Sequence, residues 1–423
     1  MTTAKAGPRH ESPYDIVRQF ARVLVDVENF YVDPVDRKKL LVGAIKGMVS
    51  ELDPHSTYLT PEEWTESRAD LQGKFAGVGV EVDFRDDAIT VIAPIEGSPA
   101  DRAGIRSGDR IVAIDGELVV DPTLEKAVKR MRGTPGTHLK LTIRRAGVPS
   151  PLNFDLVREI VTRASVRAKL LTGGVGYLRI FQFQEGAHPE FLRAAEKLKA
   201  ANGGALAGLV LDLRTNPGGF VDEAVSIADE LLDKGGIYST RHRGQVMDDV
   251  SAHRGGALAT VPMVVLVNDW SASASELLAG ALQDDARALV VGSQTFGKGS
   301  VQAVMDLPEG AGLKLTTGRY YTPSGRTIQA EGIRPDVIIA SAHNEPVSTL
   351  RERDYENKLS GEGPRGGQPA RDGGVYTMPD GGSLDPTDVR KLPEDPRGGP
   401  DYGLEVAYDV LTKQLVGRGP YVR

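Results

Sequence analysis

The 423-residue sequence predicts a multidomain α/β (α+β) protein, and three observations support this fold class. Between residues 175 and 339, apolar runs such as GLVLDL and VPMVVLV alternate with helical patterns, which predicts a largely parallel or mixed sheet with helices. Between residues 72 and 146, short alternating strands are separated by glycines, which predicts a mostly β segment with two short helices. Amphipathic helices expected at 16–30 and 34–52 precede both segments.

Both ends of the chain are expected to contain helices. The opening helices either form a packing layer or act as an arm for self-association, and a last helix, predicted from Tyr402 to Leu415, is a second candidate arm. Before this helix, residues 361–400 combine many Gly and Pro residues with almost no apolar side chains. Such a segment buries too little surface to offset its ordering entropy, so we expect it to be flexible.

The composition excludes several classes of function. The 51 Lys and Arg residues against 58 Asp and Glu residues leave a net charge of −7, so no nucleic-acid partner is expected. The absence of cysteine excludes a thiolate nucleophile, disulfides and Cys-ligated metals. The sequence has no run of about 18 apolar residues, and its first fifteen residues lack the apolar stretch of a signal peptide. We expect a soluble chain, which is compatible with the trimmed form of an exported protein.

One glycine-rich segment nearly matches a nucleotide-binding loop, but we do not expect it to bind a nucleotide. Residues 291–299 fit most of G-x-x-x-x-G-K-[ST], yet Gly299 stands where a magnesium-binding hydroxyl belongs, and a strand follows instead of a helix. Gly297 and Gly299 instead allow the backbone to crowd Lys298. Because a desolvated lysine loses its proton near neutral pH, Lys298 is a candidate base.

Three serines follow the strand VPMVVLVN, at the start of a predicted helix: Ser271, Ser273 and Ser275. Free backbone N–H groups and the helix dipole at such a position suit an oxyanion hole, so a serine here is a candidate nucleophile. The alternative is structural, because Ser273 and Glu276 also match a helix capping box. The residues alone decide neither between these interpretations nor among the three serines.

A second loop, from Arg214 to Gly219, follows the strand GLVLDL. Its Gly218 and Gly219 would let backbone N–H groups approach a substrate carbonyl, although an ordinary turn also explains them. None of the seven histidines is placed by the sequence on the strand ends that carry these loops, so a lysine is the more suitable base. No H-E-x-x-H motif and no histidine pair with metal-ligand spacing occurs, so no zinc site is expected.

Several motifs together resemble one known family. They are SASASE at 271–276 followed by AGALQD, TFGKG at 295–299, LDPHS at 52–56, NPGG at 216–219, YTPSG at 321–325 and GIRPD at 332–336. These motifs resemble those of the carboxyl-terminal processing proteases, also called tail-specific proteases, and the resemblance covers roughly residues 15–340. It implies a serine endopeptidase with a crotonase-like (ClpP/crotonase) protease core, a PDZ domain and an N-terminal helical region.

The resemblance also implies roles for individual residues. Ser273 would be the nucleophile, Lys298 the general base, and Gln302 the residue that orients the lysine. The oxyanion hole would be formed by the backbone N–H of Ala274 with that of Gly218 or Gly219. Trp270 departs from the small or polar residues that are usual beside the nucleophile, which bears on specificity rather than on activity.

By the same resemblance, the β-rich segment is identified as a PDZ domain. The loop that would hold a peptide's terminal carboxylate on its backbone amides consists of Gly77, Val78, Gly79 and Val80. The strand from Val80 to Asp83 would accept the peptide by β-augmentation, beside a helix from Leu124 to Met131. Arg132 follows this helix and either couples the PDZ and protease domains or is a solvated charge at the helix end.

The expected organisation has five parts: an N-terminal helical region at 15–70, a PDZ domain at 72–158, a protease core at 159–345, a flexible segment at 346–400 and a C-terminal helix at 401–423. Expected partners are proteins or peptides with accessible C-termini, an activating peptide or adaptor protein, and further copies of the chain in a homo-oligomer. No cofactor or metal is expected, and the expected location is periplasmic or otherwise exported. Two rival functions are an inactive PDZ scaffold and an acyl-CoA enzyme of the related fold.

Overall fold

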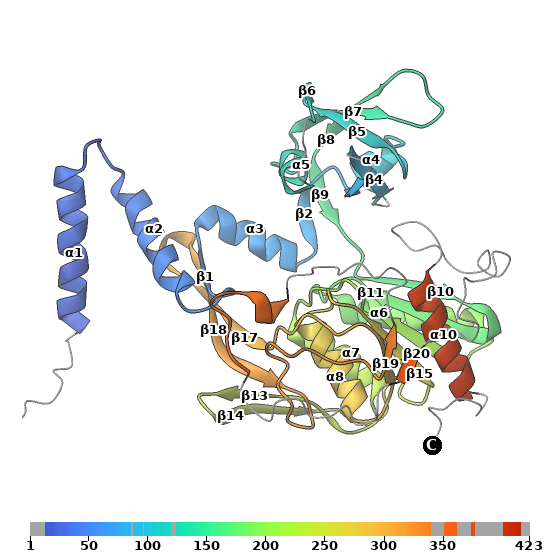
Figure 1. The fold of residues 1–423 in the computed structure, drawn as a ribbon. Helices are drawn as coiled ribbons and strands as arrows, with labels where there is room; N and C mark the ends of the chain where they lie inside the picture. The colour runs from blue at the N-terminus through green and yellow to red at the C-terminus, as the bar shows by residue number, and fades with distance from the viewer. Residues whose placement is uncertain are drawn as a thin grey trace, which may run out of the picture. The chain divides into compact units, whose positions relative to one another are not determined.

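The chain is described by a computed structural model, which covers residues 13–85, 88–95, 97–119, 124–339, 351–361, 374–376 and 401–415 (Figure 1). It divides into two compact units. The small unit consists of Met1–Trp64 with Gln302–Thr316, and the large unit consists of Thr65–Val301 with Thr317–Arg423. Most of the segment predicted to be flexible, 346–400, lies outside the described residues. Its described parts do not fit that prediction, because Glu352 is fully buried and accepts a hydrogen bond from Gln329 at 2.7 Å, and Gly374–Tyr376 pairs with a core strand.

The small unit contains α1 (Pro13–Phe30), α2 (Arg37–Ser50) and β1 (Thr57–Leu59), so both predicted opening helices are present. Asp36 caps α2 by accepting a hydrogen bond from the amide of Lys38 at 2.8 Å. β1 pairs antiparallel with the first residues of β18 (Gly312–Tyr321), and α3 (Pro61–Leu71) begins just after β1. Large apolar side chains of α1 stay exposed in the single chain, namely Ile16, Val17, Phe20, Val23, Val25 and Phe30.

The glycine-punctuated segment forms a small antiparallel β domain with two helices, as predicted. Its strands are β3 (Val80–Arg85), β4 (Ala88–Pro94), β5 (Arg110–Ile114), β6 (Glu117–Leu118), β7 (His138–Arg144) and β8 (Leu152–Val157), and its helices are α4 (Pro99–Arg102) and α5 (Leu124–Met131). Alternate residues of β7, such as Leu139, Leu141 and Ile143, are fully buried in its core. The strand order β3-β4-β5-β7-β8 leaves β3 at an edge. A separate ribbon pairs β2 (Lys74–Gly77) with β9 (Glu159–Thr162).

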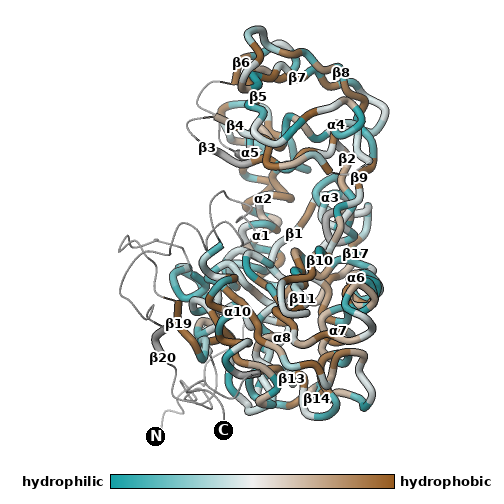
Figure 2. The backbone as a smooth tube through the Cα atoms, turned by 90° about the vertical axis from the view of Figure 1, so that its right-hand side faces the viewer, coloured by the Kyte–Doolittle hydropathy of each residue, from teal (hydrophilic) through white to brown (hydrophobic). Residues whose placement is uncertain are grey.

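The core of the large unit is a seven-stranded sheet in the order β10-β11-β12-β15-β16-β19-β20. The strands are β10 (Val166–Leu170), β11 (Val175–Ile180), β12 (Gly208–Asp212), β15 (Met263–Val267), β16 (Leu289–Gly292), β19 (Val337–Ile339) and β20 (Gly374–Tyr376). Only β10 runs antiparallel to its neighbour, and the other neighbouring pairs are parallel. The predicted largely parallel or mixed sheet is therefore confirmed. Figure 2 colours the backbone by hydropathy and labels β10, β11 and β19 of this sheet.

Helices cover this sheet through two separate apolar clusters. One cluster joins the sheet to α6 (Ala187–Ala201), α7 (Val221–Leu231) and α8 (Ala274–Asp284). The other joins it to α10 (Tyr402–Leu415), which contacts β12, β15 and β16 and matches the predicted last helix. The apolar residues Leu404, Val406, Val410 and Leu411 of α10 pack against its own sheet, and a role of this helix in self-association stays a prediction.

Further strands complete the large unit. β13 (Gly236–His242) and β14 (Gln245–Ser251) form a hairpin, and β13 also pairs with the last residues of β18. β17 (Ser300–Asp306) begins in the large unit and continues into the small one. In the part of the chain that the structure describes, no helix is both long enough and apolar enough to cross a membrane.

Candidate active site

Two of the loops singled out in the sequence follow neighbouring strands of the core sheet. The loop from Arg214 to Gly219 comes after β12, and Ser271–Ser275 come after β15. Since β12 and β15 are parallel neighbours, their carboxyl ends lie at the same edge of the sheet. The two loops are in contact there, because the amide of Ala272 donates to the carbonyl oxygen of Asn216 at 3.0 Å.

The three candidate serines lie in different environments. Ser271 is fully buried and donates its hydroxyl to the carbonyl of Leu213 at 2.8 Å, while buried Ser275 donates to the carbonyl of Asn216 at 3.0 Å. Ser273 is half-buried at the start of α8, with a φ of 57° that is rare for a residue other than glycine. Strained backbone at the turn between a strand and a helix is typical of a serine nucleophile, so the geometry favours Ser273.

The glycine loop lies directly against Ser273. A Cβ atom built on Gly218 would lie 2.8 Å from Cβ of Ser273, and one built on Gly219 would lie 2.2 Å from the carbonyl oxygen of Phe183. Both positions have positive φ and leave no room for a side chain. The approach of their N–H groups to a substrate carbonyl stays a prediction. The amide of Gly218 donates to Oδ1 of Asn216 at 2.9 Å. No hydrogen bond joins the amides of Gly219 or Ala274 to another described residue.

A fully buried carboxylate, Glu276, connects the serine and lysine segments. Its Oε2 accepts hydrogen bonds from the amide of Ser273 at 2.8 Å and from the amide of Lys298 at 2.9 Å. Its Oε1 accepts from the amide of Gly297 at 2.7 Å and from the hydroxyl of Thr295 at 2.5 Å. The bond from the amide of Ser273 to Glu276 is one of the two bonds of the predicted capping box. The same oxygen atom, Oε2, also accepts from the amide of Lys298 in the lysine loop. Sequence reasoning treated this residue only as a cap and missed the second function.

The buried position of Glu276 makes the stability of the protein depend on pH. Burial raises the pKa of Glu276 from 4.5 to about 7, although its four hydrogen bonds act in the opposite direction. Between these two values the folded chain holds a proton that the unfolded chain releases. The stability contribution of that proton is present below pH 4.5 and is lost as the pH rises through 7, by about 3 kcal/mol in total.

Glu276→Gln, which cannot ionise, is expected to remove this dependence. The free energy of unfolding of the wild type should fall by about 3 kcal/mol relative to Glu276→Gln between pH 4.5 and pH 8. Urea unfolding of both proteins at four pH values measures the difference. Glu196→Gln, at an exposed position of α6, is the matched control and should give a curve parallel to the wild type. Parallel curves for Glu276→Gln as well would contradict the assignment.

Lys298 is half-buried in a loop that requires its two glycines. A Cβ atom on Gly299 would lie 2.4 Å from the amide nitrogen of Gln329, and Gly297 has a φ of 98°. The backbone is thus crowded at the two glycines that flank Lys298, and desolvation of the lysine amine stays a prediction. The segment after the loop continues into β17, as predicted, rather than into the helix that a phosphate-binding loop requires.

Gln302 lies on β17 and belongs to the small unit, whereas Lys298 belongs to the large unit. Its Nε2 atom is 3.5 Å from Oγ1 of Thr316, which in turn donates to Oδ1 of Asp53 at 3.1 Å. Asp53 also accepts from the hydroxyl of Ser56 at 2.7 Å, so the LDPHS motif builds the network beside Gln302. The orienting role of Gln302 stays a prediction.

Comparisons with known proteins identify the family. Residues 174–339 match the model of peptidase family S41, residues 90–145 match a PDZ domain, and residues 4–63 match the N-terminal domain of the activating protease CtpB. A carboxy-terminal-processing protease of Bartonella bacilliformis is 41% identical over 83% of this chain and 82% of its own length. The chain belongs to peptidase family S41. It is a serine-type peptidase of the carboxy-terminal processing group and carries a PDZ domain.

Other relatives of this S41 peptidase agree with the assignment. The carboxy-terminal processing protease CtpA of Bacillus subtilis is 34% identical over 79% of this chain and 70% of its own. Among solved structures, the photosystem II D1 C-terminal processing protease superposes with a TM-score of 0.50 at 32% identity. That match covers 77% of this chain and 86% of the other. The predicted family and enzyme class are therefore confirmed.

A pocket of about 440 Å³ lies at the predicted place in the PDZ domain of this S41 peptidase, and Arg163, Gln182 and Gln184, from outside the predicted PDZ segment, also line it. The predicted loop residues line it, namely Gly77, Val78, Gly79 and Val80. Val128 and Met131 of α5 and the first residues of edge strand β3 also line it. Arg132 lines the pocket too, with its guanidinium carbon 5.8 Å from the ring centre of Phe75. The lining mixes apolar side chains with charged and amide side chains. Val128, Met131 and the edge position of β3 suit the end of an extended peptide.

Proposed function

We propose that this S41 peptidase is an endopeptidase that captures protein C-termini on its PDZ domain and cleaves peptide bonds with a Ser273/Lys298 dyad. The observation that carries the proposal is the shared Oε2 atom of Glu276, which accepts from the amides of both residues. This contact supports a stable arrangement of the two segments at the start of α8. The glycine loop beside it offers N–H groups for an oxyanion hole.

The proposed reaction proceeds through an acyl-enzyme. The neutral amine of Lys298 accepts the hydroxyl proton of Ser273 as Oγ attacks the substrate carbonyl carbon. The amides of Ala274 and Gly219 stabilise the negative oxygen of the tetrahedral intermediate, and the protonated lysine donates its proton to the leaving amine. Water then hydrolyses the ester with Lys298 again as base. Gly219 is preferred to Gly218 because the amide of Gly218 already donates to Asn216.

Peptide capture follows from the pocket of the PDZ domain. A substrate C-terminus would add to the edge strand β3, with its carboxylate on the amides of Gly77–Val80 and its last side chain against Val128 and Met131. Arg132 is proposed to couple peptide binding to the protease core. An activating peptide or adaptor protein, a homo-oligomer, a crotonase-like core and an exported location remain predictions of the same hypothesis.

Covalent labelling tests the nucleophile. The wild-type chain is incubated with a fluorophosphonate, which forms a stable adduct with an activated serine, and the labelled peptide is identified by mass spectrometry. We expect one adduct, on Ser273. Without the fluorophosphonate, the same chain should release peptide fragments from a flexible protein substrate. Labelling of Ser271 or Ser275, or no labelling of a cleaving enzyme, would overturn the assignment. Peptide binding without labelling or cleavage would favour an inactive PDZ scaffold. Turnover of an acyl-CoA would favour an acyl-CoA enzyme of the related fold.

A further inference from the structure

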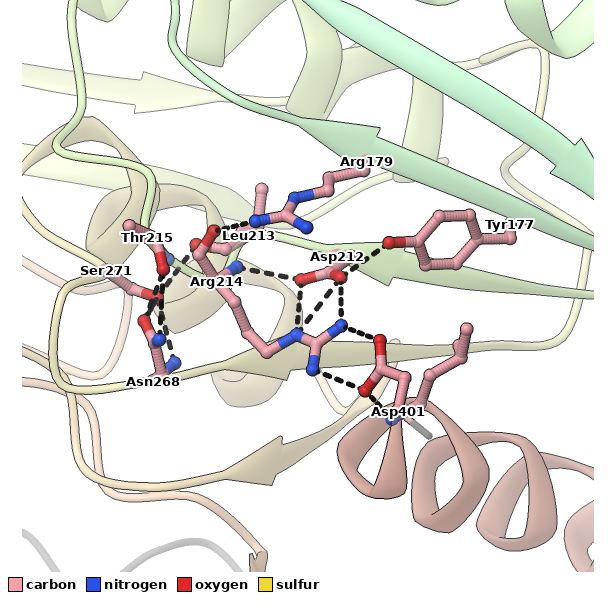
Figure 3. A network of polar contacts seen from close by, with 10 residues as sticks. Tyr177, Arg179, Asp212, Leu213, Arg214, Thr215, Asn268, Ser271 and Asp401 are labelled. Atoms are coloured by element: carbon pink, nitrogen blue, oxygen red, sulfur yellow. Dashed lines mark hydrogen bonds and ion pairs between the residues drawn. The ribbon is translucent and has the colours of Figure 1, made fainter. Parts of the chain in front are cut away.

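An arginine at the start of the glycine loop is held by two buried carboxylates. The guanidinium of Arg214 donates from Nη1 and Nη2 to Asp401, both at 2.7 Å, and from Nε and Nη2 to Asp212 at 3.0 and 2.6 Å (Figure 3). Tyr177 donates its hydroxyl to Asp212 at 2.7 Å. Burial opposes charge on these groups, but their mutual attraction lowers the pKa of Asp212 and raises that of Arg214. Arg214 is therefore a cation, and the carboxylates of Asp212 and Asp401 hold its guanidinium from two sides.

Asp401 comes from a distant part of the chain, at the start of α10. It accepts a hydrogen bond from the amide of Leu404 at 3.0 Å, so one carboxylate both caps α10 and binds Arg214. Gly403 keeps the space between them open, because a Cβ atom there would lie 2.9 Å from Nη1 of Arg214. Only 4% of the Asp401 side chain is exposed, so the pair is shielded from water.

Rigid contacts continue from Arg214 to the proposed oxyanion hole. Thr215 has a φ of 59°, and its amide donates to Oδ1 of Asn268 at 2.8 Å (Figure 3). Asn216 is fully buried, accepts from the amide of Gly218 at 2.9 Å, and donates its side-chain amide to the carbonyl of Ile180 at 2.9 Å. Every residue between Arg214 and Gly218 is thus fixed by a side-chain contact or by the proline ring of Pro217. These contacts follow one another along the loop from Arg214 to Gly218.

We propose that Asp401 is a positioning residue for peptide hydrolysis: through Arg214 it fixes the glycine loop that carries the Gly219 amide. Docking of α10 on the core sheet then sets the rate of the chemical step and not only the stability of the fold. This inference rests on the proposed Ser273/Lys298 mechanism.

The test compares full-length variants with a matched control on the same helix. Asp401→Asn removes the charge that binds Arg214, and we expect kcat to fall roughly 10- to 100-fold while KM stays within about twofold. The rate of fluorophosphonate labelling of Ser273 should fall in parallel, and the shape of the pH profile should not change. Asp409→Asn breaks the ion pair between Asp409 and Lys413 on the surface of α10 and should leave kcat unchanged.

Gly403→Ala separates positioning from folding. Alanine favours the helix, so α10 should be at least as stable, but the added methyl group displaces the Arg214 guanidinium. We expect kcat to fall while Tm stays at or above that of Asp401→Asn, because Asp401 keeps its charge and its cap of α10. Wild-type kcat and labelling rate in Asp401→Asn, or wild-type kcat in Gly403→Ala, would overturn the inference. A separate result would overturn the proposed Ser273/Lys298 mechanism: Ser273→Ala would retain hydrolysis, whatever the kcat of Asp401→Asn.

Discussion

Replacing Ser273 by alanine is expected to lower kcat for peptide hydrolysis by roughly 10⁴- to 10⁶-fold, with little change in stability. The hydroxyl is the only group of this side chain that the reaction requires, and its loss prevents formation of the acyl-enzyme. The half-buried side chain at the start of α8 can lose one oxygen without leaving a cavity. The measurement is the rate of fragment release from a flexible protein with a C-terminal recognition sequence, together with KM and Tm.

Ser271→Ala and Ser275→Ala are the matched controls, because both serines lie within two residues of Ser273 in the same segment. Their hydroxyls donate to the carbonyls of Leu213 and Asn216, so each variant should lose about 1 kcal/mol of stability. We expect both to retain a kcat far above that of Ser273→Ala. Hydrolysis that survives in Ser273→Ala but disappears in one control would move the nucleophile to that serine.

The protease core was predictable because its strands and helices have strong local patterns. β12 and β15 are buried at every position, and such uninterrupted apolar runs between glycine or polar residues indicate interior strands. The last helix was predicted with the correct ends for a related reason, since its apolar residues face the sheet at helical spacing. In both cases burial and local periodicity agree.

Elements without such a pattern were missed. In the hairpin of β13 and β14, the second strand is largely exposed, so no apolar run in the sequence indicates it. The turn at Arg243 and Gly244, where both residues have positive φ, was the best indication of a hairpin. Helix α3 has no apolar stripe either. Its signal was a capping box, because the amide of Thr60 donates to Glu63 at 2.9 Å and the amide of Glu63 is 3.4 Å from the hydroxyl of Thr60.

The sequence named the site residues but not the contacts that join them. Motif resemblance singled out Ser273, but the physical difference among the three serines is visible only in the structure. The hydroxyls of Ser271 and Ser275 donate to backbone carbonyls, whereas Ser273 has a positive φ. Asp401 lies 187 residues from Arg214 in the chain, and no local rule pairs two charges over that separation. Such contacts depend on how α10 docks, which is a property of the folded core.

Replacing Lys298 by alanine is expected to lower kcat by roughly 10³-fold or more, with KM nearly unchanged. In the proposed mechanism the amine accepts the Ser273 proton and later donates it to the leaving amine, so both chemical steps lose their acid–base group. The backbone of this loop should keep its position, because the contact with Glu276 uses the amide of Lys298 and not its side chain. Steady-state kinetics of fragment release across pH measure the effect, and the rise of activity with pH that reflects a titrating base should disappear.

Lys298→Arg decides whether the position needs a base or only a positive charge. A guanidinium stays protonated at every accessible pH, so it preserves the charge but cannot accept a proton. We expect Lys298→Arg to be as inactive as Lys298→Ala. Substantial activity in Lys298→Arg would show that the lysine acts as a fixed cation and that another group is the base. Lys197→Ala, at an exposed lysine of α6, is the control for loss of a positive charge and should match the wild type. Partial recovery of Lys298→Ala by a small added amine would identify proton transfer as the lost step, because such an amine restores a base without restoring the side chain.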